Sequence, residues 1–328
     1  MNPVVSVVVT AFERKEFLMN ALRSIDSQEV PKEMFEVILV KNFSDDTIDR
    51  YCSERGIITI SMSGSIGEFL SCAIERSKGN IIAFLDDDDE WEPQKLDNVI
   101  RAFTSDDDIG YFHNDYSYID YSGKIFRFKR NVEGRRKNFR DFIFSFQNRD
   151  ISKLFRFNAD FNLSCIAVRR DIVSSFNNDL SKIRGSTDSF FFFLSLLSKV
   201  SVYVSSKKLT RYRVHTLNLS RSTDVARKEK EIKRQLFALY TLENLFSGNP
   251  VSGTESYKAL EMLKTEYEMI SIIFSSDRRL FLLKKLLLLI SFPRSCSNPL
   301  RIRIIMFSLL YLTAGSFSQK VYQKILTI

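Results

Sequence analysis

The sequence predicts an α/β protein built on a mixed or mainly parallel sheet, with a helical region after it. Short apolar runs rich in β-branched residues alternate with amphipathic stretches along the first part of the chain. This pattern is typical of strands that are buried on both faces and connected by helices. After about Asp224 the strand-like runs stop and only helical patterns follow. We therefore expect one large domain over residues 1–223 and a basic helical region over residues 224–328.

The elements of the large domain follow from this alternation. The predicted strands are Val4–Val9, Phe35–Val40, Ile57–Ser61, Ile81–Leu85 and Val200–Val204. The predicted helices are Lys15–Gln28, a stretch that ends at Glu54, Ile66–Arg76 and Phe190–Leu197. They repeat apolar residues at three- and four-residue spacing or, in the last case, are apolar throughout. The segment Tyr111–Asn162 gives weak signals for either element, and Lys124–Arg140 mixes aromatic with basic residues.

Four further helices are predicted in the C-terminal region. They span Lys230–Leu245, Ser256–Phe274, Arg278–Ile290 and Ile302–Ile325. Within the last two, short apolar runs are flanked by basic residues, yet each run is too short to cross a bilayer. Two interpretations stay open, an interfacial membrane helix and packing against the large domain.

The composition is that of a globular protein with a basic balance. Hydrophobic residues make up 44% of the 328 positions, enough to bury a core. The net charge of +8 indicates an anionic partner, which could be a nucleotide, a phospholipid surface or nucleic acid. The four cysteines lack the paired spacing of a zinc site or a short disulfide framework, so we expect buried thiols in a reducing compartment. The first ten residues run directly into a strand pattern, so we expect no secretion leader.

An acidic run follows the predicted strand Ile81–Leu85. Asp86, Asp87, Asp88 and Asp89 stand directly after it, and Thr10–Glu13 follow the first strand. Ligands of parallel α/β sheets bind beyond the carboxyl ends of the strands, so both segments are expected at one crevice. Carboxylates there can converge on a divalent cation, which needs hard oxygen ligands and can bridge two phosphates. The alternative is a solvated acidic turn or helix start, because aspartate is a good N-cap.

The order of these motifs resembles a known family. The opening VSVVVTAFERKEFLMNALRSIDSQ, the helix end SKGN, the run FLDDDDEW and the tail EPQKL together resemble family 2 glycosyltransferases of the GT-A fold. The resemblance spans Val4–Leu96 and implies a Rossmann-like sheet that binds a nucleotide-diphospho-sugar. It also implies a divalent metal, Mg²⁺ or Mn²⁺.

The resemblance implies a role for each matched residue. Those that contact the nucleotide are Thr10, Ala11, Phe12, Glu13, Asp86 and Asp87. Asp86 and Asp88 match the metal-binding carboxylates of the family's DXD motif. Trp91 matches an aromatic position, and we expect it to anchor the core.

The chain departs from the family after its second strand. The family usually has an acidic residue there that holds the uracil of a UDP-sugar, whereas this chain has Lys41 and Asn42 followed by Phe43. Asn42 can donate and accept hydrogen bonds at a base edge, so we assign it to nucleotide binding. UDP- and GDP-linked donors therefore both stay open.

Two downstream segments also resemble family motifs. GSTDSFFFFL, residues 185–194, implies that Asp188 deprotonates the acceptor, as an inverting transfer requires; the alternative is an N-cap. YRVHTLNLSRS, residues 212–222, implies that Arg213 clamps phosphate and that His215 ligates the metal or contacts the diphosphate. A histidine satisfied by the backbone is the alternative for His215, and it is the role we expect of His113.

The sequence therefore predicts a metal-dependent, inverting glycosyltransferase that acts on an acceptor hydroxyl or phosphate, in the synthesis of a surface polysaccharide, glycolipid or glycoprotein glycan. We expect it in the cytoplasm or peripheral on the cytoplasmic face of the membrane, with a lipid-linked acceptor as one option. The alternative is a catalytically degenerate protein that acts as a membrane-surface or scaffold protein. A nucleotidyltransferase is disfavoured because the loop TAFERKE lacks glycine. Nucleic acid is not expected, since no nucleic-acid module is recognisable.

Overall fold

The structure is a computed structural model that describes residues 2–127, 139–145, 151–215, 225–247 and 254–275. The chain divides into two compact units. The first comprises Met1–Asn148 and Phe157–Val214, and the second comprises Arg149–Arg156 and His215–Ile328. Each unit is described by itself.

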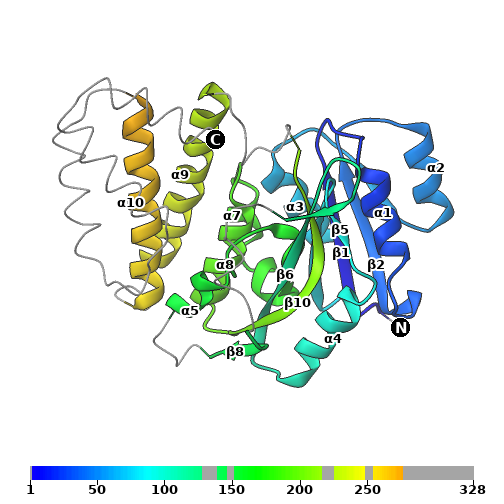
Figure 1. Ribbon diagram of the computed structural model, residues 1–328, viewed down its shortest axis with the longest axis horizontal. Helices are drawn as coiled ribbons and strands as arrows, with labels where there is room; N and C mark the ends of the chain where they lie inside the picture. The colour runs from blue at the N-terminus through cyan, green and yellow to red at the C-terminus, as the bar shows by residue number, and fades with distance from the viewer. Residues whose placement is uncertain (1, 128–138, 146–150, 216–224, 248–253, 276–328) are drawn as a thin grey trace. The chain divides into compact units, whose positions relative to one another are not determined.

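The first unit contains one mixed sheet of ten strands with helices packed against it (Figure 1). The strands are β1 (Val5–Ala11), β2 (Phe35–Lys41), β3 (Ile58–Ser61), β4 (Ile81–Asp86), β5 (Glu90–Trp91), β6 (Ile109–Ile119), β7 (Ile125–Phe126), β8 (Phe142–Phe144), β9 (Ile166–Arg169) and β10 (Ser201–Arg213). The helices are α1 (Leu18–Asp26), α2 (Asp46–Glu54), α3 (Ile66–Arg76), α4 (Lys95–Ser105), α6 (Arg170–Ser174), α7 (Asn177–Leu180) and α8 (Thr187–Leu197), with 3₁₀ turns η1 (Lys32–Met34) and η3 (Leu163–Cys165).

The sheet has a parallel half and a mixed half. Its strand order is β3-β2-β1-β4-β9-β6-β10-β5, with β7 on β6 and β8 on β10. Strands β3, β2, β1 and β4 are mutually parallel, whereas β9 runs antiparallel to both β4 and β6. Strand β10 is parallel to β6 and antiparallel to β5. The predicted α/β fold class with a mixed or parallel sheet is confirmed.

The core of the first unit lies on both faces of the parallel half. Every residue of β1 is buried, as its β-branched run predicts. On α8, the side chains of Phe190–Phe193 are wholly buried, and the ring of Phe191 stacks on Phe84 of β4 at 4.5 Å between centroids. Each such phenylalanine stabilises the fold by about 1.5–3 kcal/mol. The predicted buried helix at Phe190–Leu197 is confirmed.

The mixed half departs from the sequence-based expectation. The segment with weak signals contains β6, a long strand near the centre of the sheet that buries His113 and Asn114. Strand β10 continues well past the predicted end at Val204, through residues predicted to form a polar segment. Both strands carry buried polar residues that are hydrogen-bonded to other parts of the chain. For this reason neither shows an unbroken apolar run.

The second unit contains α5 (Ser152–Arg156), α9 (Val225–Ser247) and α10 (Glu255–Ser275). Helices α9 and α10 lie side by side, and the hydroxyl of Tyr240 donates a hydrogen bond of 2.6 Å to Glu268. No described helix is long and apolar enough to cross a bilayer. The helices predicted at Arg278–Ile290 and Ile302–Ile325, and most of the basic aromatic stretch Lys124–Arg140, lie outside the described residues.

The described cysteines are free thiols. Cys52 and Cys165 are buried and Cys72 is half-buried. The fourth cysteine, Cys296, lies outside the described residues. The expectation of buried thiols is confirmed for Cys52 and Cys165.

The first turn of α3 packs directly against backbone. A capping box between Ser65 and Glu68 fixes where the helix begins. One residue into the helix, the backbone N–H of Gly67 donates to the Ile183 carbonyl at 3.0 Å. A Cβ atom at Gly67 would lie 2.2 Å from the Leu180 carbonyl oxygen and 2.4 Å from that of Ile183. Glycine is therefore required at this contact.

Replacing Gly67 by alanine is expected to lower the free energy of unfolding by about 3 kcal/mol, because backbone atoms must move apart. Gly56→Ala is the matched control, since Gly56 has a positive φ of 66° but nothing within 4 Å of an added Cβ. We expect it to cost only about 1 kcal/mol, from the left-handed backbone alone. Urea unfolding of both variants measures the difference. Equal costs would contradict the described packing of α3.

Candidate active site

The acidic run lies at the carboxyl edge of the parallel half. Strands β1 and β4 are neighbours, and Thr10 pairs in register with Asp86. The loop after β1 and the aspartates after β4 therefore share one edge, as predicted. Asp87–Asp89 are almost wholly buried and Asp86 is half-buried. The acidic run is therefore largely buried, and it is not a solvated turn.

Arg14 is the cation that the structure places on this run. Its guanidinium contacts both carboxylate oxygens of Asp87, with Nε at 3.2 Å from Oδ2, and lies 2.8 Å from Asp88 Oδ2. Burial lowers the pKa of Arg14, but Asp87 and Asp88 outweigh this effect and raise that pKa above its usual value. We predicted no role for Arg14 from the sequence. The sequence did contain a signal for this contact, because Arg14 is a basic residue in the loop after β1, and this loop faces the acidic run.

The two outer aspartates resist ionisation. Burial and the charges of the other three carboxylates raise the pKa of Asp86 well above its usual range. Burial and the charge of Asp88 raise the pKa of Asp89 to about 7. Asp89 still accepts two hydrogen bonds, from Asn162 Nδ2 at 3.0 Å and from the Arg213 backbone N–H at 2.9 Å. The cluster is thus a region of excess negative charge that favours a cation.

The turn η3 is hydrogen-bonded to the acidic run and to strands β5 and β10. The Ser164 hydroxyl accepts a hydrogen bond from the Asp86 backbone N–H at 3.0 Å. The Ser164 carbonyl accepts from Trp91 Nε1 at 2.8 Å and from the Thr210 hydroxyl at 3.1 Å. Trp91 is 2% exposed, so its predicted position in the core is confirmed.

Lys95 contacts the same turn and is wholly buried. Its ammonium contacts Asn114 Oδ1, donates to the Ser164 carbonyl at 3.3 Å and lies 5.2 Å from the centroid of the Trp91 ring. Burial lowers the pKa of Lys95 to about 7. We did not predict this buried lysine from the sequence, because a lysine at a helix start is usually exposed.

Arg213 is placed differently from the expectation that it clamps phosphate. Its side chain is wholly buried, with Nε donating to the Asp88 carbonyl at 2.8 Å and Nη1 donating to the carbonyls of Asp120 and Tyr121 at 3.0 and 3.1 Å. Nη2 contacts the Glu90 carboxylate. Because protein acceptors occupy these donors, the structure gives Arg213 a role in holding the acidic run.

Asp188 is linked to the acidic run through one residue. Its Oδ2 accepts a hydrogen bond from the Asn162 backbone N–H at 3.1 Å, while the Asn162 side chain donates to Asp89. Its Oδ1 accepts from the Ser189 backbone N–H at 2.9 Å. The N-cap of α8 is Ser186, which makes no side-chain capping bond. Asp188 is therefore not the N-cap that the alternative interpretation describes.

The loop after β1 is held by Asn42. The Glu13 backbone, at a positive φ of 56°, donates to Asn42 Oδ1 at 2.7 Å. Phe12 is 49% exposed, and its ring centroid lies 5.9 Å from that of Phe69. Thr10 and Ala11 are buried within β1. An exposed aromatic ring and an amide therefore lie in and beside the loop that follows β1.

The two histidines lie in different units of the chain. His113 is buried and its Nε2 lies 2.9 Å from the Phe161 carbonyl, as expected of a structural histidine. His215 belongs to the second unit, whereas the aspartates belong to the first. Its assignment as a metal ligand or diphosphate contact stays a prediction.

The acidic run could hold a divalent cation only if a bound ligand supplied further oxygen atoms. Asp86 and Asp88 supply hard oxygen donors, which Mg²⁺ and Mn²⁺ prefer. Arg14 already contacts Asp88, however, and no group of three His, Cys, Asp or Glu side chains within the described ranges is arranged to hold a metal. Phosphate oxygens of a bound nucleotide would have to complete the shell.

The chain matches glycosyl transferase family 2 over residues 6–175. It is 23% identical over 236 residues to an uncharacterized glycosyltransferase of Haemophilus influenzae, covering 70% of this chain and 74% of that one. It is 32% identical over 110 residues to the glycosyltransferase AglE of Haloferax volcanii, covering 31% of this chain and 36% of that protein.

Solved structures share the fold at low identity. TarS 1–349 of S. aureus in complex with UDP-GlcNAc is 14% identical, with a TM-score of 0.60 over 100% of this chain and 90% of that one. The mannosyltransferase PcManGT of Pyrobaculum calidifontis, in complex with GDP-Man and Mn²⁺, is 13% identical, with a TM-score of 0.56 over 100% of this chain and 86% of that one.

The fold is that of GT-A glycosyltransferases. The family match covers more than half of the chain, so the chain belongs to glycosyl transferase family 2. It is a glycosyltransferase, and the resemblance seen in its sequence is confirmed.

The buried Lys95 predicts a distinctive dependence of stability on pH. Its pKa is lower in the folded than in the unfolded protein, so the unfolded chain binds more protons between pH 7 and pH 10. Stability of the wild type should therefore rise over this window relative to Lys95→Met, by at most about 1.4 kcal/mol per pH unit. Urea unfolding at several pH values measures this slope. Lys78→Met, at an exposed lysine, serves as the control and should run parallel to the wild type.

Parallel curves for the wild type and Lys95→Met would contradict the described burial of this ammonium group.

Proposed function

We propose that the protein transfers a sugar from a nucleotide-diphospho-sugar to an acceptor hydroxyl or phosphate, with inversion and with a divalent metal. The observation that carries the proposal is the link through Asn162. This residue donates from its backbone to Asp188 and from its side chain to Asp89. A carboxylate suited to act as base is thereby held beside carboxylates suited to the diphosphate end of a donor.

The donor is proposed to lie along the carboxyl edge of β1 and β4. The nucleotide complexes of the similar structures, with UDP-GlcNAc and GDP-Man, support a nucleotide sugar and leave the base open. Phe12 offers an exposed ring against which a base can stack. Because Asn42 Oδ1 accepts from Glu13, its Nδ2 remains as the donor to a base carbonyl. Both uracil and guanine carry such a carbonyl.

A bound Mg²⁺ or Mn²⁺ would be held by Asp86 and Asp88 and would supply Lewis-acid stabilisation of the leaving diphosphate. The Mn²⁺ complex of PcManGT supports this choice. Arg14 forms ion pairs with Asp87 and Asp88 in the described structure. Its planar guanidinium is also a matching donor for phosphate oxygens, so it can stay within the site when a donor binds.

Asp188 is proposed as the base. Its carboxylate takes the proton of the acceptor O–H as the acceptor oxygen bonds to the anomeric carbon, and the bond from that carbon to the diphosphate oxygen breaks. Backbone N–H groups of Asn162 and Ser189 hold the carboxylate in place. Attack from the face opposite the diphosphate inverts the anomeric carbon.

Surface polysaccharide, glycolipid or glycoprotein glycan synthesis is the proposed setting. A relative with 26% identity over 107 residues, covering 30% of this chain and 42% of that protein, is a putative teichuronic acid biosynthesis glycosyltransferase of Bacillus subtilis. The net charge of +8 supports a cytoplasmic protein peripheral on an anionic membrane face, with a lipid-linked acceptor. The second candidate is a member without transfer activity that serves as a membrane-surface or scaffold protein.

Asp188→Asn is expected to lower the rate of donor turnover by about 10²- to 10⁴-fold, because the base is lost, while donor affinity stays unchanged. The assay follows release of UDP or GDP from UDP-GlcNAc and GDP-mannose with water as acceptor. Asp179→Asn, at an exposed ion pair with Lys182, is the control and should keep full activity. In the same reaction, proton NMR should show the β anomer of the sugar first, since both donors are α-linked.

Unchanged turnover in Asp188→Asn would remove Asp188 as base, and first release of the α anomer would refute inversion. Failure of the wild type to turn over any donor that it binds would favour the non-catalytic candidate.

A further inference from the structure

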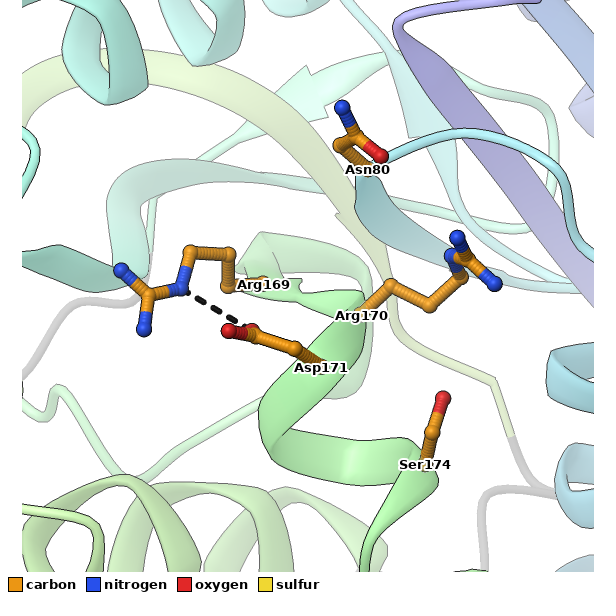
Figure 2. Close-up of a pocket in the computed structure, with 5 residues that line it drawn as sticks. All are labelled: Asn80, Arg169, Arg170, Asp171 and Ser174. Atoms are coloured by element: carbon orange, nitrogen blue, oxygen red, sulfur yellow. Dashed lines mark hydrogen bonds and ion pairs between the residues drawn. The ribbon is translucent and has the colours of Figure 1, made fainter.

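A cavity opens near the start of β4, at the end of that strand opposite the acidic run. It has a volume of about 510 Å³. Figure 2 shows the residues that line it, which are Asn80, Arg169, Arg170, Asp171 and Ser174. Asn80 immediately precedes β4, whereas Asp86 ends it, so the six residues of that strand separate the two sites by roughly 20 Å. The cavity therefore does not belong to the candidate active site.

The fold brings this lining together where β9 ends and α6 begins. Arg169 pairs with Ile81 across the antiparallel strands β9 and β4. The backbone N–H of Arg170 then donates to the Asn80 carbonyl at 2.9 Å. Helix α6 carries Asp171 and Ser174 past the same opening. The site is thus fixed by the sheet and its adjoining helix.

The charges of the lining do not cancel. Arg169 donates from Nε to Asp171 Oδ1 at 2.9 Å and from Nη1 to the Asp107 carbonyl at 2.9 Å. Arg170 makes no side-chain hydrogen bond or ion pair with any residue in the described ranges, and its Nε is shielded from solvent. Figure 2 shows its guanidinium on the other side of the opening from that of Arg169. One guanidinium charge in the cavity wall is therefore left without an acceptor.

An unpaired guanidinium at a cavity selects an anion. Guanidinium groups bind phosphate through paired N–H donors, and the part of the Arg170 side chain that reaches the opening can provide them. Asn80 and Ser174 are exposed side chains that line the same opening. Together with the Asp171 carboxylate they offer the donors and acceptors that sugar hydroxyls require.

The size and polarity of the cavity define the ligand further. Its volume lies within the range of small-molecule sites, and each of the five residues that line it carries a polar or charged group. We propose that this cavity binds a phosphorylated sugar, with the phosphate on Arg170 and the sugar hydroxyls on Asn80, Asp171 and Ser174. The inference does not depend on the proposed function.

Equilibrium dialysis of the full chain against radiolabelled glucose 6-phosphate tests the proposal. We expect Arg170→Gln to weaken binding at least tenfold and Ser174→Ala at least twofold. Arg23→Gln, which removes the same charge from an exposed position of α1, is the control and should bind as the wild type does. Inorganic phosphate and glucose, used as competitors, should each displace the label less well than unlabelled glucose 6-phosphate.

Asp88→Asn reports on binding at the acidic run and should leave the affinity for glucose 6-phosphate unchanged. Absence of binding to the wild type, wild-type affinity in a folded Arg170→Gln variant, or loss of affinity in Asp88→Asn would each overturn the proposal. Displacement by phosphate as effective as that by glucose 6-phosphate would overturn recognition of the sugar.

Discussion

Repulsion among four consecutive carboxylates is the constraint around which the first unit is built. Three of them are almost wholly buried, and burial together with neighbouring carboxylates raises the pKa of Asp86 and of Asp89. The structure offsets this cost with the Arg14 guanidinium, which contacts Asp87 and Asp88, and with hydrogen bonds to Asp89 from the Asn162 amide and the Arg213 backbone N–H. A run of carboxylates is thereby kept together at a strand end, where it can accept a cation and a diphosphate.

The turn η3 and its N-cap residue Asn162 link the acidic run to other strands of the sheet. Asn162 contacts both Asp89 and Asp188, and Ser164 contacts β4, β5 and β10. Strand β9, which follows the turn, separates β4 from β6 and marks the change from the parallel to the mixed half. Groups far apart in sequence are therefore positioned by one short segment, and a change there would disturb the acidic run and the proposed base together.

The sequence predicted the elements in which one hydrophobic pattern repeats. It did not predict contacts between residues that are far apart in the chain. Apolar runs predicted β1 to β4, and strand topology predicted that Thr10 would lie beside Asp86. The contact of Arg14 with Asp87 joins positions 73 residues apart, which no periodicity reveals. Lys95 and Arg213 are wholly buried because hydrogen-bond acceptors surround them, whereas sequence patterns place such residues at the surface. Buried polar residues likewise concealed β6 and the length of β10.

We propose that the acidic run binds the nucleotide-sugar donor together with a divalent cation. Isothermal titration of the purified chain with UDP, GDP and TDP, each with and without Mn²⁺, is the decisive measurement. We expect that one nucleotide binds, that its affinity depends on Mn²⁺, and that an Asp86→Asn, Asp88→Asn variant loses this dependence. Binding that is equally strong without metal, or no binding of any nucleotide, would contradict it.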